Sequence, residues 1–405
     1  MASQQSHKHH YVPEWYQKRF LSSGEQQLHL LDLNPPTIQF PSGARKTKPP
    51  YRRMSPSQCF CDEDLYMLRF AKSDNDIIER QFFGTVDKKG APAVEVFDKI
   101  IGFSPDIVEG HRHILPYMGA QRFRTPRGLD WLKERTRAGH KNAVLMMMQR
   151  WFQQHTTMWG EGVWEVVCAT DSKTKFIVSD NPVTFYNQVL YPTKNKYPGI
   201  EEWPQAGTRT IFPLGPESCL VITHMQYVRN PQTKPDELRV NARQFEMVLT
   251  YMGNIQYGRQ LSEEEVLKIN LILKLKAIRH IAAGKREWLY PERNLRAPGW
   301  ANLDNDWFLM PNPWKVPFSS QLMVGYDDGT SWTNDDYGRK PWDPNFKDPK
   351  RREKEWKSRV QAQRTWSKKR AGKSLSRVYE ALKNNSADHQ MNEYLDSIQP
   401  RRSRK

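Results

Sequence analysis

The strongest folding signal in the chain is the stretch from Ser262 to Gly284, SEEEVLKINLILKLKAIRHIAAG. Ser262 followed three residues later by Glu265 is a capping box, which satisfies the first backbone N–H groups of a helix. A wide apolar face follows, and glycine is the residue most often found just beyond a helix end. The pattern predicts one long helix over 262–283, with its apolar face covering a sheet.

The sheet that this helix covers is expected upstream of it. Short runs rich in β-branched and aromatic residues, bounded by turn residues, predict strands over 163–169, 175–179, 208–214 and 219–224. Because they follow one another closely, these strands are expected to form an antiparallel sheet. One earlier strand is expected over 28–33.

The first half of the chain is expected to be mostly helical. Apolar periodicity predicts helices over 74–101, with a break near Pro92, and over 107–122 and 128–155. The basic, proline-bounded segment 41–58 is expected to be an irregular surface loop. The fold class is therefore α+β: a helical first half, an antiparallel sheet packed by a long helix in the second half, and an irregular and basic helical C-terminal extension.

The 405 residues are enough for a large hydrophobic core, and composition divides them into three parts. An α+β body is expected over 1–296, an irregular, acidic, Trp/Pro-rich extension over 297–344, and a basic tail over 345–405. The tail holds 18 Lys and Arg against 7 Asp and Glu, so it supplies most of the net charge of +17. Its basic residues alternate with Trp356 and Trp366, a pattern that suits phosphate contacts and base stacking, or else a solvated helical appendage.

The cysteine content and hydropathy indicate the compartment. There are only four cysteines, and neither a secretory signal nor a long apolar run is found, so we expect an intracellular protein, cytoplasmic or nuclear, that does not span a membrane. Cys59 and Cys61 lack a second pair and give poor support for zinc. The sequence also lacks a glycine-rich phosphate loop, a nucleophile elbow and a His-Glu-x-x-His motif, which disfavours P-loop hydrolases, α/β-hydrolases and zincin proteases.

Five polar residues are candidates for a site. His10 adjoins an aromatic segment that would anchor it, and it is a candidate base or metal ligand. Asp180 and Asn181 follow a predicted strand, where they suit a metal ligand and an orienting amide, or an ordinary Asx turn. Arg124, at a helix end, is a candidate phosphate clamp or a partner of the helix dipole. Glu79 is a candidate acid in the site or the structural partner of an arginine.

Several of these residues lie in motifs that resemble the family known as domain of unknown function 4238. The likeness runs from residue 8 to residue 285 and rests on four motifs in order: His9-His10-Tyr11-Val12-Pro13, Arg124-Thr125-Pro126, Ser179-Asp180-Asn181-Pro182-Val183 and Phe212-Pro213-Leu214-Gly215-Pro216. The resemblance implies a common fold with polar positions at His10, Arg124, Asp180 and Asn181, and it implies no established activity. It favours one shared site over separate structural roles.

The leading hypothesis is a nucleic-acid-directed protein, in its enzymatic form a metal-dependent phosphodiesterase, with a divalent metal ion on His10 and Asp180. In that form Arg124 would hold the phosphate and Asn181 would orient the ligands. The alternative is a non-catalytic nucleic-acid-binding or interaction module that acts through its basic tail. A third hypothesis is an enzyme on a small anionic substrate.

Overall fold

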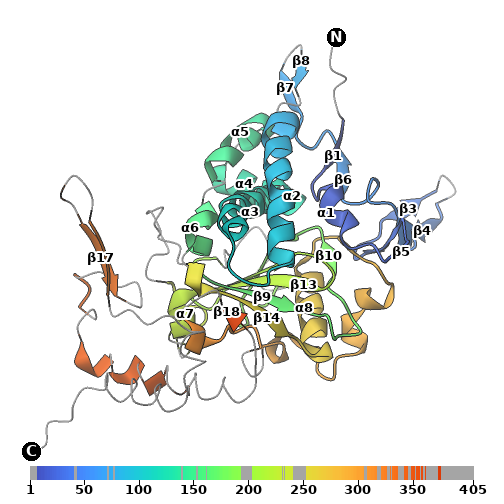
Figure 1. Cartoon of the computed structure of the whole chain (residues 1–405). Coiled ribbons are helices and arrows are strands. Elements are labelled where there is room, and N and C mark those ends of the chain that lie inside the picture. The colour runs from blue at the N-terminus through green and yellow to red at the C-terminus, as the bar shows by residue number, and fades with distance from the viewer. Residues whose placement is uncertain are drawn as a thin grey trace, which may run out of the picture.

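The computed structural model confirms the α+β fold class and describes most of residues 7–361 (Figure 1). A helical layer and a single long helix lie on opposite faces of a central sheet. The described residues are 7–40, 43–70, 73–75, 78–137, 140–151, 154–160, 162–192, 203–229, 231, 233–239, 252–304, 308–316, 321–325, 329, 331–335, 342–344, 348–351, 353–355, 357–358, 361 and 373–374.

The central sheet has six strands in the order β11-β12-β13-β9-β14-β18. Three of the predicted strands are confirmed here as β9, β12 and β13, with ends that differ by one residue. The sheet is not wholly antiparallel as expected, because β14 pairs with β9 in parallel. The strands are β9 (Gly162–Cys168), β11 (Thr184–Tyr186), β12 (Arg209–Pro213), β13 (Ser218–His224), β14 (Ile255–Gln260) and β18 (Lys373–Ser374).

A second sheet joins segments that are far apart in the sequence. Its four antiparallel strands lie in the order β10-β15-β2-β5. The strand predicted over 28–33 is confirmed as β2, whereas the strand predicted over 175–179 is shorter and belongs to this sheet. The strands are β2 (Leu28–Asp32), β5 (Tyr51–Met54), β10 (Val178–Ser179) and β15 (His280–Ala283).

Strand β13 shows how the two hydrophobic cores lie on either side of the central sheet. Leu220 and Ile222 belong to the core under the helical layer, while Cys219 and Val221 belong to the core under α8 (Glu263–Lys276). The alternation follows from the period of two along a strand. The helix at the second face is the one predicted to cover the sheet.

The helical layer differs from the prediction in its boundaries. Pro92 lies inside α2 and does not break it. The helix expected over 128–155 is divided, because Arg137 takes a left-handed conformation with φ 51° at the end of α4. The helices are α1 (Glu14–Lys18), the π-helix η1 (Ile78–Phe83), α2 (Gly84–Asp98), α3 (Pro105–Arg124), α4 (Pro126–Thr136), α5 (Lys141–Trp151), α6 (Gln154–Gly160) and α7 (Met225–Arg229).

The N-terminal quarter contains several strands, so the prediction of a mostly helical first half is wrong there. The segment 41–58, expected to be an irregular loop, contributes β4 and β5. Its basic side chains are exposed as expected. The two-stranded ribbons of this quarter pair β1 (Lys8–His10) with β6 (Cys61–Glu63), β3 (Thr37–Gln39) with β4 (Arg45–Thr47), and β7 (Leu68–Phe70) with β8 (Ser73–Asn75).

Helix α8 begins as predicted and ends seven residues early. The capping box is present, since the Ser262 hydroxyl accepts from the Glu265 N–H and the Glu265 carboxylate accepts from the Ser262 N–H. The chain then turns and forms β15, so Gly284 follows a strand rather than the helix. Glycine is needed there because a Cβ would stand 2.9 Å from the Phe20 carbonyl oxygen.

The first part of the 297–344 extension packs against the body. Trp300, Leu303, Phe308 and Leu309 are buried in the core under α8. This part includes two short 3-10 helices, η5 (Trp300–Asn302) and η7 (Pro313–Lys315), and a third, η4 (Pro291–Arg293), lies just before the extension. A hairpin of β16 (Gln321–Gly325) and β17 (Ser331–Asp335) follows. The hairpin is regular structure where irregular chain was expected.

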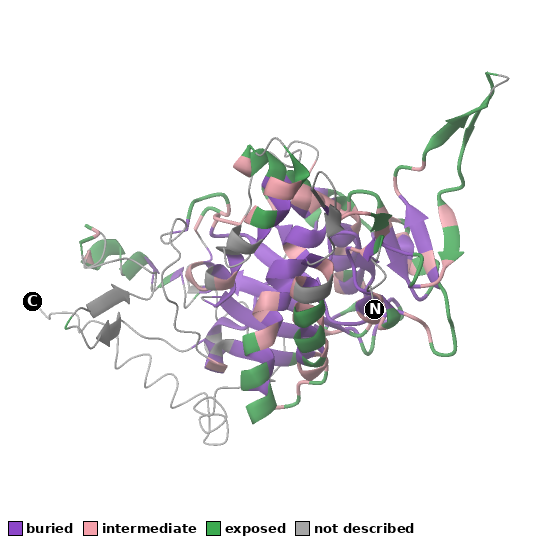
Figure 2. Cartoon of the chain, turned by 90° about the horizontal axis from the view of Figure 1, so that it is seen from above, coloured by how far each residue is buried: buried purple, intermediate pink, exposed green. Residues whose placement is uncertain are grey.

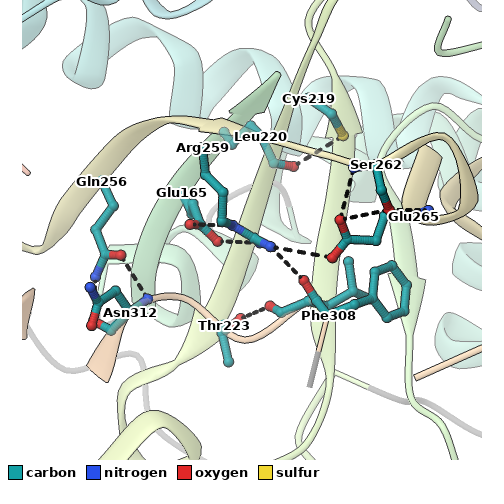
Figure 3. A network of polar contacts seen from close by, with 11 residues as sticks. Glu165, Cys219, Leu220, Thr223, Gln256, Arg259, Ser262, Glu265, Phe308 and Asn312 are labelled. Atoms are coloured by element: carbon teal, nitrogen blue, oxygen red, sulfur yellow. Dashed lines mark hydrogen bonds and ion pairs between the residues drawn. The ribbon is translucent and has the colours of Figure 1, made fainter. Parts of the chain in front are cut away.

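A buried polar network holds the extension to the central sheet (Figure 3). Arg259 on β14 forms a two-pronged ion pair with Glu165 on β9, with N···O distances of 2.8 and 2.7 Å. The same guanidinium donates to the Phe308 carbonyl at 2.9 Å, while the Gln256 and Asn312 groups exchange two further hydrogen bonds. These five residues are almost fully buried, so this network is part of the core.

The basic tail is described only in part. Residues 349–351, 353–355, 357–358 and 361 are helical, and β18 adds an edge to the central sheet. Trp356 and Trp366 lie outside the described residues.

Candidate functional site

Asp180 lies at the end of β10, where it determines how the chain leaves α8. Its carboxylate accepts the backbone N–H groups of Ile278, Arg279 and His280 at 2.9, 2.7 and 2.8 Å. The N–H of Ile278 would otherwise continue the helix, so Asp180 ends α8 and starts β15. Burial raises the pKa of Asp180, and the three N–H donors oppose that shift. A metal ion on Asp180 would have to compete with these three hydrogen bonds.

Asn181 joins the helical layer to the end of α8. Its side-chain oxygen accepts from Arg122 at 3.1 Å, and its amide donates to the Lys276 carbonyl at 3.4 Å. Arg127 donates to the same carbonyl at 3.2 Å. The last residue of α8, which lacks a helical partner for its carbonyl, is thereby satisfied from two sides.

Arg124 is buried at the end of α3 and is surrounded by protein groups. Its guanidinium donates to the Gln121 side chain through Nε and Nη2, and to Asp87 at 3.0 Å. It also lies over the rings of Phe83 and Tyr117. These contacts join α2 to α3, and a phosphate could reach the guanidinium only if they were rearranged.

His10 and Glu79 lie in different surroundings from Asp180. The Nε2 atom of His10 is 3.3 Å from the Ser57 carbonyl and 3.7 Å from Glu14, and burial lowers the pKa of this imidazole. Glu79 lies in η1, where its charge acts on Tyr66, another residue near Arg124. The carboxylate that pairs with Arg124 is Asp87.

The structure brings the family-like segments together through Tyr11. The Gln121 side chain donates to the Tyr11 carbonyl at 2.7 Å, and Gln121 also holds Arg124. Burial together with the charge of Asp180 holds the pKa of the Tyr11 hydroxyl well above its usual range. The segments thus meet, but the predicted polar side chains have separate protein partners, and no set of three or more His, Cys, Asp or Glu residues within the described ranges is arranged to hold a metal ion.

A second polar group, not predicted from the sequence, lies at the adjacent rim of the four-stranded sheet. Asp32 ends β2 and His280 begins β15, and the two residues are direct cross-strand partners. The Arg279 side chain reaches Asp32 with N···O distances of 3.2, 3.2 and 3.0 Å. Burial alone would raise the pKa of Asp32, but the hydrogen bonds from Arg279 and the Asn34 N–H lower it.

The two ring nitrogens of His280 have different environments. Nε2 is buried and stands 3.6 Å from the Asp32 carboxylate, longer than an ordinary hydrogen bond. Nδ1 has no protein partner among the described residues and is not enclosed. Burial lowers the pKa of His280, with Arg279 and Arg52 acting in the same direction and Asp32 opposing them.

No motif in the sequence indicated this group directly. Arg279 and His280 fell inside the helix predicted over 262–283, and Asp32 is one strand-end acid among many. Only the pairing of β2 with β15, across almost 250 residues, brings them together. One weak signal existed, the polar pair Arg279-His280 interrupting an otherwise apolar run.

A basic hairpin projects from the sheet beside this group. Strands β3 and β4 are exposed along their whole length and extend from the body as a two-stranded arm (Figure 2). Residues 33–61 contain no acid, and the hairpin and its return carry Arg45, Lys46 and Lys48. Ile38 and Phe40 are also exposed, at 42% and 44%. We call residues 34–50 the basic arm.

Comparison with known proteins gives one match. A family model described as "Protein of unknown function (DUF4238)" matches residues 8–287. No curated protein and no solved structure matches the chain significantly. Among the described helices, none combines the length and the apolar character that crossing a membrane requires.

Proposed function

Since this chain belongs to the DUF4238 family of proteins of unknown function, we propose a function from its own surface: it binds nucleic acid through the basic arm. The basic surplus of the sequence motivates a polyanionic partner. Part of that positive charge lies on the exposed side chains of the basic arm, Arg45, Lys46 and Lys48.

The observation that carries the proposal is the composition and exposure of the basic arm. Arg45, Lys46 and Lys48 are exposed and form no ion pair with any residue in the described ranges. Surface cations in folded proteins usually alternate with acids, which reduces the local potential. Here no acid occurs between Asp32 and Asp62, so the positive potential of the arm is not cancelled locally.

The shape of the arm suits a nucleic acid better than a small anion. A two-stranded ribbon can enter a groove or lie along a strand, and its cations then release counterions from several phosphates at once. The exposed Ile38 and Phe40 offer apolar contacts to bases beside those cations. A small anion would need a concave site, and the arm is convex.

The enzymatic form of the hypothesis, a phosphodiesterase with a divalent metal ion on His10 and Asp180, stays a prediction. The hydrogen bonds that occupy Asp180 and Arg124 favour structural roles for both residues. Cleavage of RNA or DNA that requires Mg²⁺ or Mn²⁺ and disappears in a folded Asp180→Asn variant would support that form.

The binding proposal is tested with three variants that each remove three positive charges. The arm variant changes Arg45, Lys46 and Lys48 to alanine, and the tail variant changes Lys368, Lys369 and Arg370. The control variant changes Lys88, Lys89 and Lys133, exposed residues of the helical layer. Fluorescence anisotropy measures the Kd for a labelled oligonucleotide at several salt concentrations.

We expect the arm variant to bind the oligonucleotide more weakly than the wild type. The slope of the logarithm of the binding constant against the logarithm of the salt concentration should be smaller by up to about 3, because each phosphate contact adds roughly 0.7–0.9 to that slope. The control variant should bind as the wild type does. A loss confined to the tail variant would instead favour the alternative in which the tail binds. Equal binding by all four proteins, or none by the wild type, would overturn the proposal.

A further inference from the structure

We propose that Asp32 and His280 form a general-base pair that cleaves single-stranded RNA at the base of the basic arm. The inference rests on the proposed function, because the arm would deliver the RNA to this pair. It concerns a different set of residues from the family-like polar positions, and it assigns the pair a substrate class.

The position of the pair relative to the arm is the first argument. Asp32 is the last residue of β2, and the arm follows it at once; Arg52 lies in β5, where the chain returns. Leu30 is the cross-strand partner of both Arg52 and Ala282, and Asp32 is the partner of His280. Directly opposed residues share a face of a sheet, so Asp32, His280 and Arg52 lie on one face at the rim from which the arm projects.

The orientation of the pair is the second argument. Arg279 and the Asn34 N–H hold both oxygens of Asp32, so the carboxylate has one orientation against Nε2 of His280. A hydrogen on Nε2 is favoured by that negative charge, which leaves the lone pair on Nδ1. Because Nδ1 has no partner among the residues that the structure describes and is not enclosed, it is the nitrogen available to a ligand.

The neighbouring charges are the third argument. The Arg279 side chain is 44% exposed while it holds Asp32, and Arg52 is exposed on the same face as His280. Two guanidinium groups beside one imidazole can bind a phosphodiester on either side of the base. The other acid that acts on Arg279 is Asp62, whose pKa is raised by burial.

The chemistry fits RNA because RNA carries its own nucleophile. Nδ1 of His280 accepts the proton of a 2′-hydroxyl, the 2′-oxygen attacks the adjacent phosphorus, and the bond from phosphorus to the 5′-oxygen breaks. The 5′-oxygen leaves with the bonding electron pair and takes a proton from water, and the imidazolium later returns its proton to water. The products are a 2′,3′-cyclic phosphate and a 5′-hydroxyl, and no other reactant is needed.

The experiment uses the full chain in EDTA with two labelled single strands, one of RNA and one with 2′-O-methyl groups throughout. The variants are His280→Gln and the matched control His29→Gln. His29 is three residues from Asp32 on the same strand, and its side chain points to the opposite face, where it bonds the Tyr51 hydroxyl at 2.6 Å. Cleavage is followed on gels, and binding is measured by anisotropy on the methylated strand.

We expect the wild type and His29→Gln to cleave RNA and to leave the methylated strand intact. His280→Gln should bind the methylated strand as the wild type does and cleave RNA at least about a hundredfold more slowly, the lower end of what a general base contributes. His280→Ala with added imidazole provides a second measurement, and cleavage should rise with the imidazole concentration.

The outcomes separate the two proposals. If the methylated strand is not bound, the proposed function fails. If it is bound but RNA stays intact, or if His280→Gln cleaves at the wild-type rate, the general-base assignment is wrong and the arm remains a binding element. Cleavage of a DNA strand in EDTA would also contradict the mechanism, since DNA lacks the 2′-hydroxyl.

Discussion

Two arginine–carboxylate pairs hold sheets together in this protein, and their surroundings differ. Arg259 and Glu165 meet inside the central sheet, where both side chains are 3% exposed. The third guanidinium nitrogen of Arg259, Nη1, donates to the Phe308 carbonyl. Arg279 and Asp32 meet at the rim of the smaller sheet, where the arginine is 44% exposed and His280 stands beside the carboxylate.

The difference separates structural polar groups from available ones. In the central sheet every donor and acceptor of the pair faces a protein partner, which is the condition for burying charge. At the rim, one ring nitrogen and two guanidinium groups still face outward. Polar residues of the first kind hold the fold together through their protein partners, and those of the second kind are where we propose that a ligand acts.

The largest effect is expected from breaking the buried pair. Arg259→Met leaves Glu165 charged, buried and unpaired, and should lower the free energy of unfolding by about 3–5 kcal/mol. Urea denaturation followed by tryptophan fluorescence measures it. The double variant Arg259→Met with Glu165→Leu removes both charges and should recover much of the lost stability. If the double variant were as unstable as Arg259→Met alone, the unpaired charge of Glu165 would not be the cause of the loss.

A somewhat smaller effect is expected at the end of α8. Asp180→Ala leaves the N–H groups of residues 278–280 without their acceptor, and we expect a loss of roughly 3 kcal/mol, because part of that turn can be rehydrated. Asp180→Asn should cost less, since one amide oxygen remains. If neither variant changed the melting temperature, Asp180 would be free for a ligand and the metal hypothesis would gain.

The third prediction concerns a buried histidine that, unlike His280, has no acid beside it. His111 packs on Trp164 with ring centroids 4.7 Å apart, and burial lowers its pKa to about 4. The unfolded chain binds this proton near pH 6.5, so the stability contribution is present above that value and is lost as pH falls towards 4. At pH 5 the loss is about 2 kcal/mol.

His111→Phe should remove this dependence, because phenylalanine has a similar shape and no proton to bind. The measurement is the difference in free energy of unfolding between wild type and variant at pH 7.5 and at pH 5. The difference should move by about 2 kcal/mol in favour of the variant at the lower pH. A constant difference would mean that the pKa of His111 is the same in the folded protein as in the unfolded chain.

Local signals in the sequence were enough for the elements that are stabilised locally. The capping box at Ser262 and the runs of β-branched and aromatic residues in β9, β12 and β13 are local signals, and the structure confirms the elements that they predict. The end of α8 could not be predicted in the same way, because the residue that ends it, Asp180, lies almost 100 positions away.

The candidate site shows the same limit. His10, Arg124, Asp180 and Asn181 lie in family-like motifs and occupy defined positions in the fold, and the charge of Glu79 acts on Tyr66. The Asp32–His280 pair depends on strand register between distant segments, and no spacing along the chain encodes that register. The basic segment 41–58, which includes the second half of the basic arm, was expected as a surface loop, whereas β3 and β4 were not expected.

The central claim, that the rim binds a ligand while the buried pairs support the fold, is tested most directly by the double variant Arg52→Ala with Arg279→Ala. Both arginine side chains are exposed, but Arg279→Ala leaves the Asp32 carboxylate, which is 5% exposed, with the Asn34 N–H as its remaining donor. We therefore expect the free energy of unfolding to fall by roughly 2 kcal/mol, less than for Arg259→Met. The affinity for the methylated strand should nevertheless fall at least about tenfold, the equivalent of 1.4 kcal/mol. Unchanged affinity together with a large loss of stability would contradict the account.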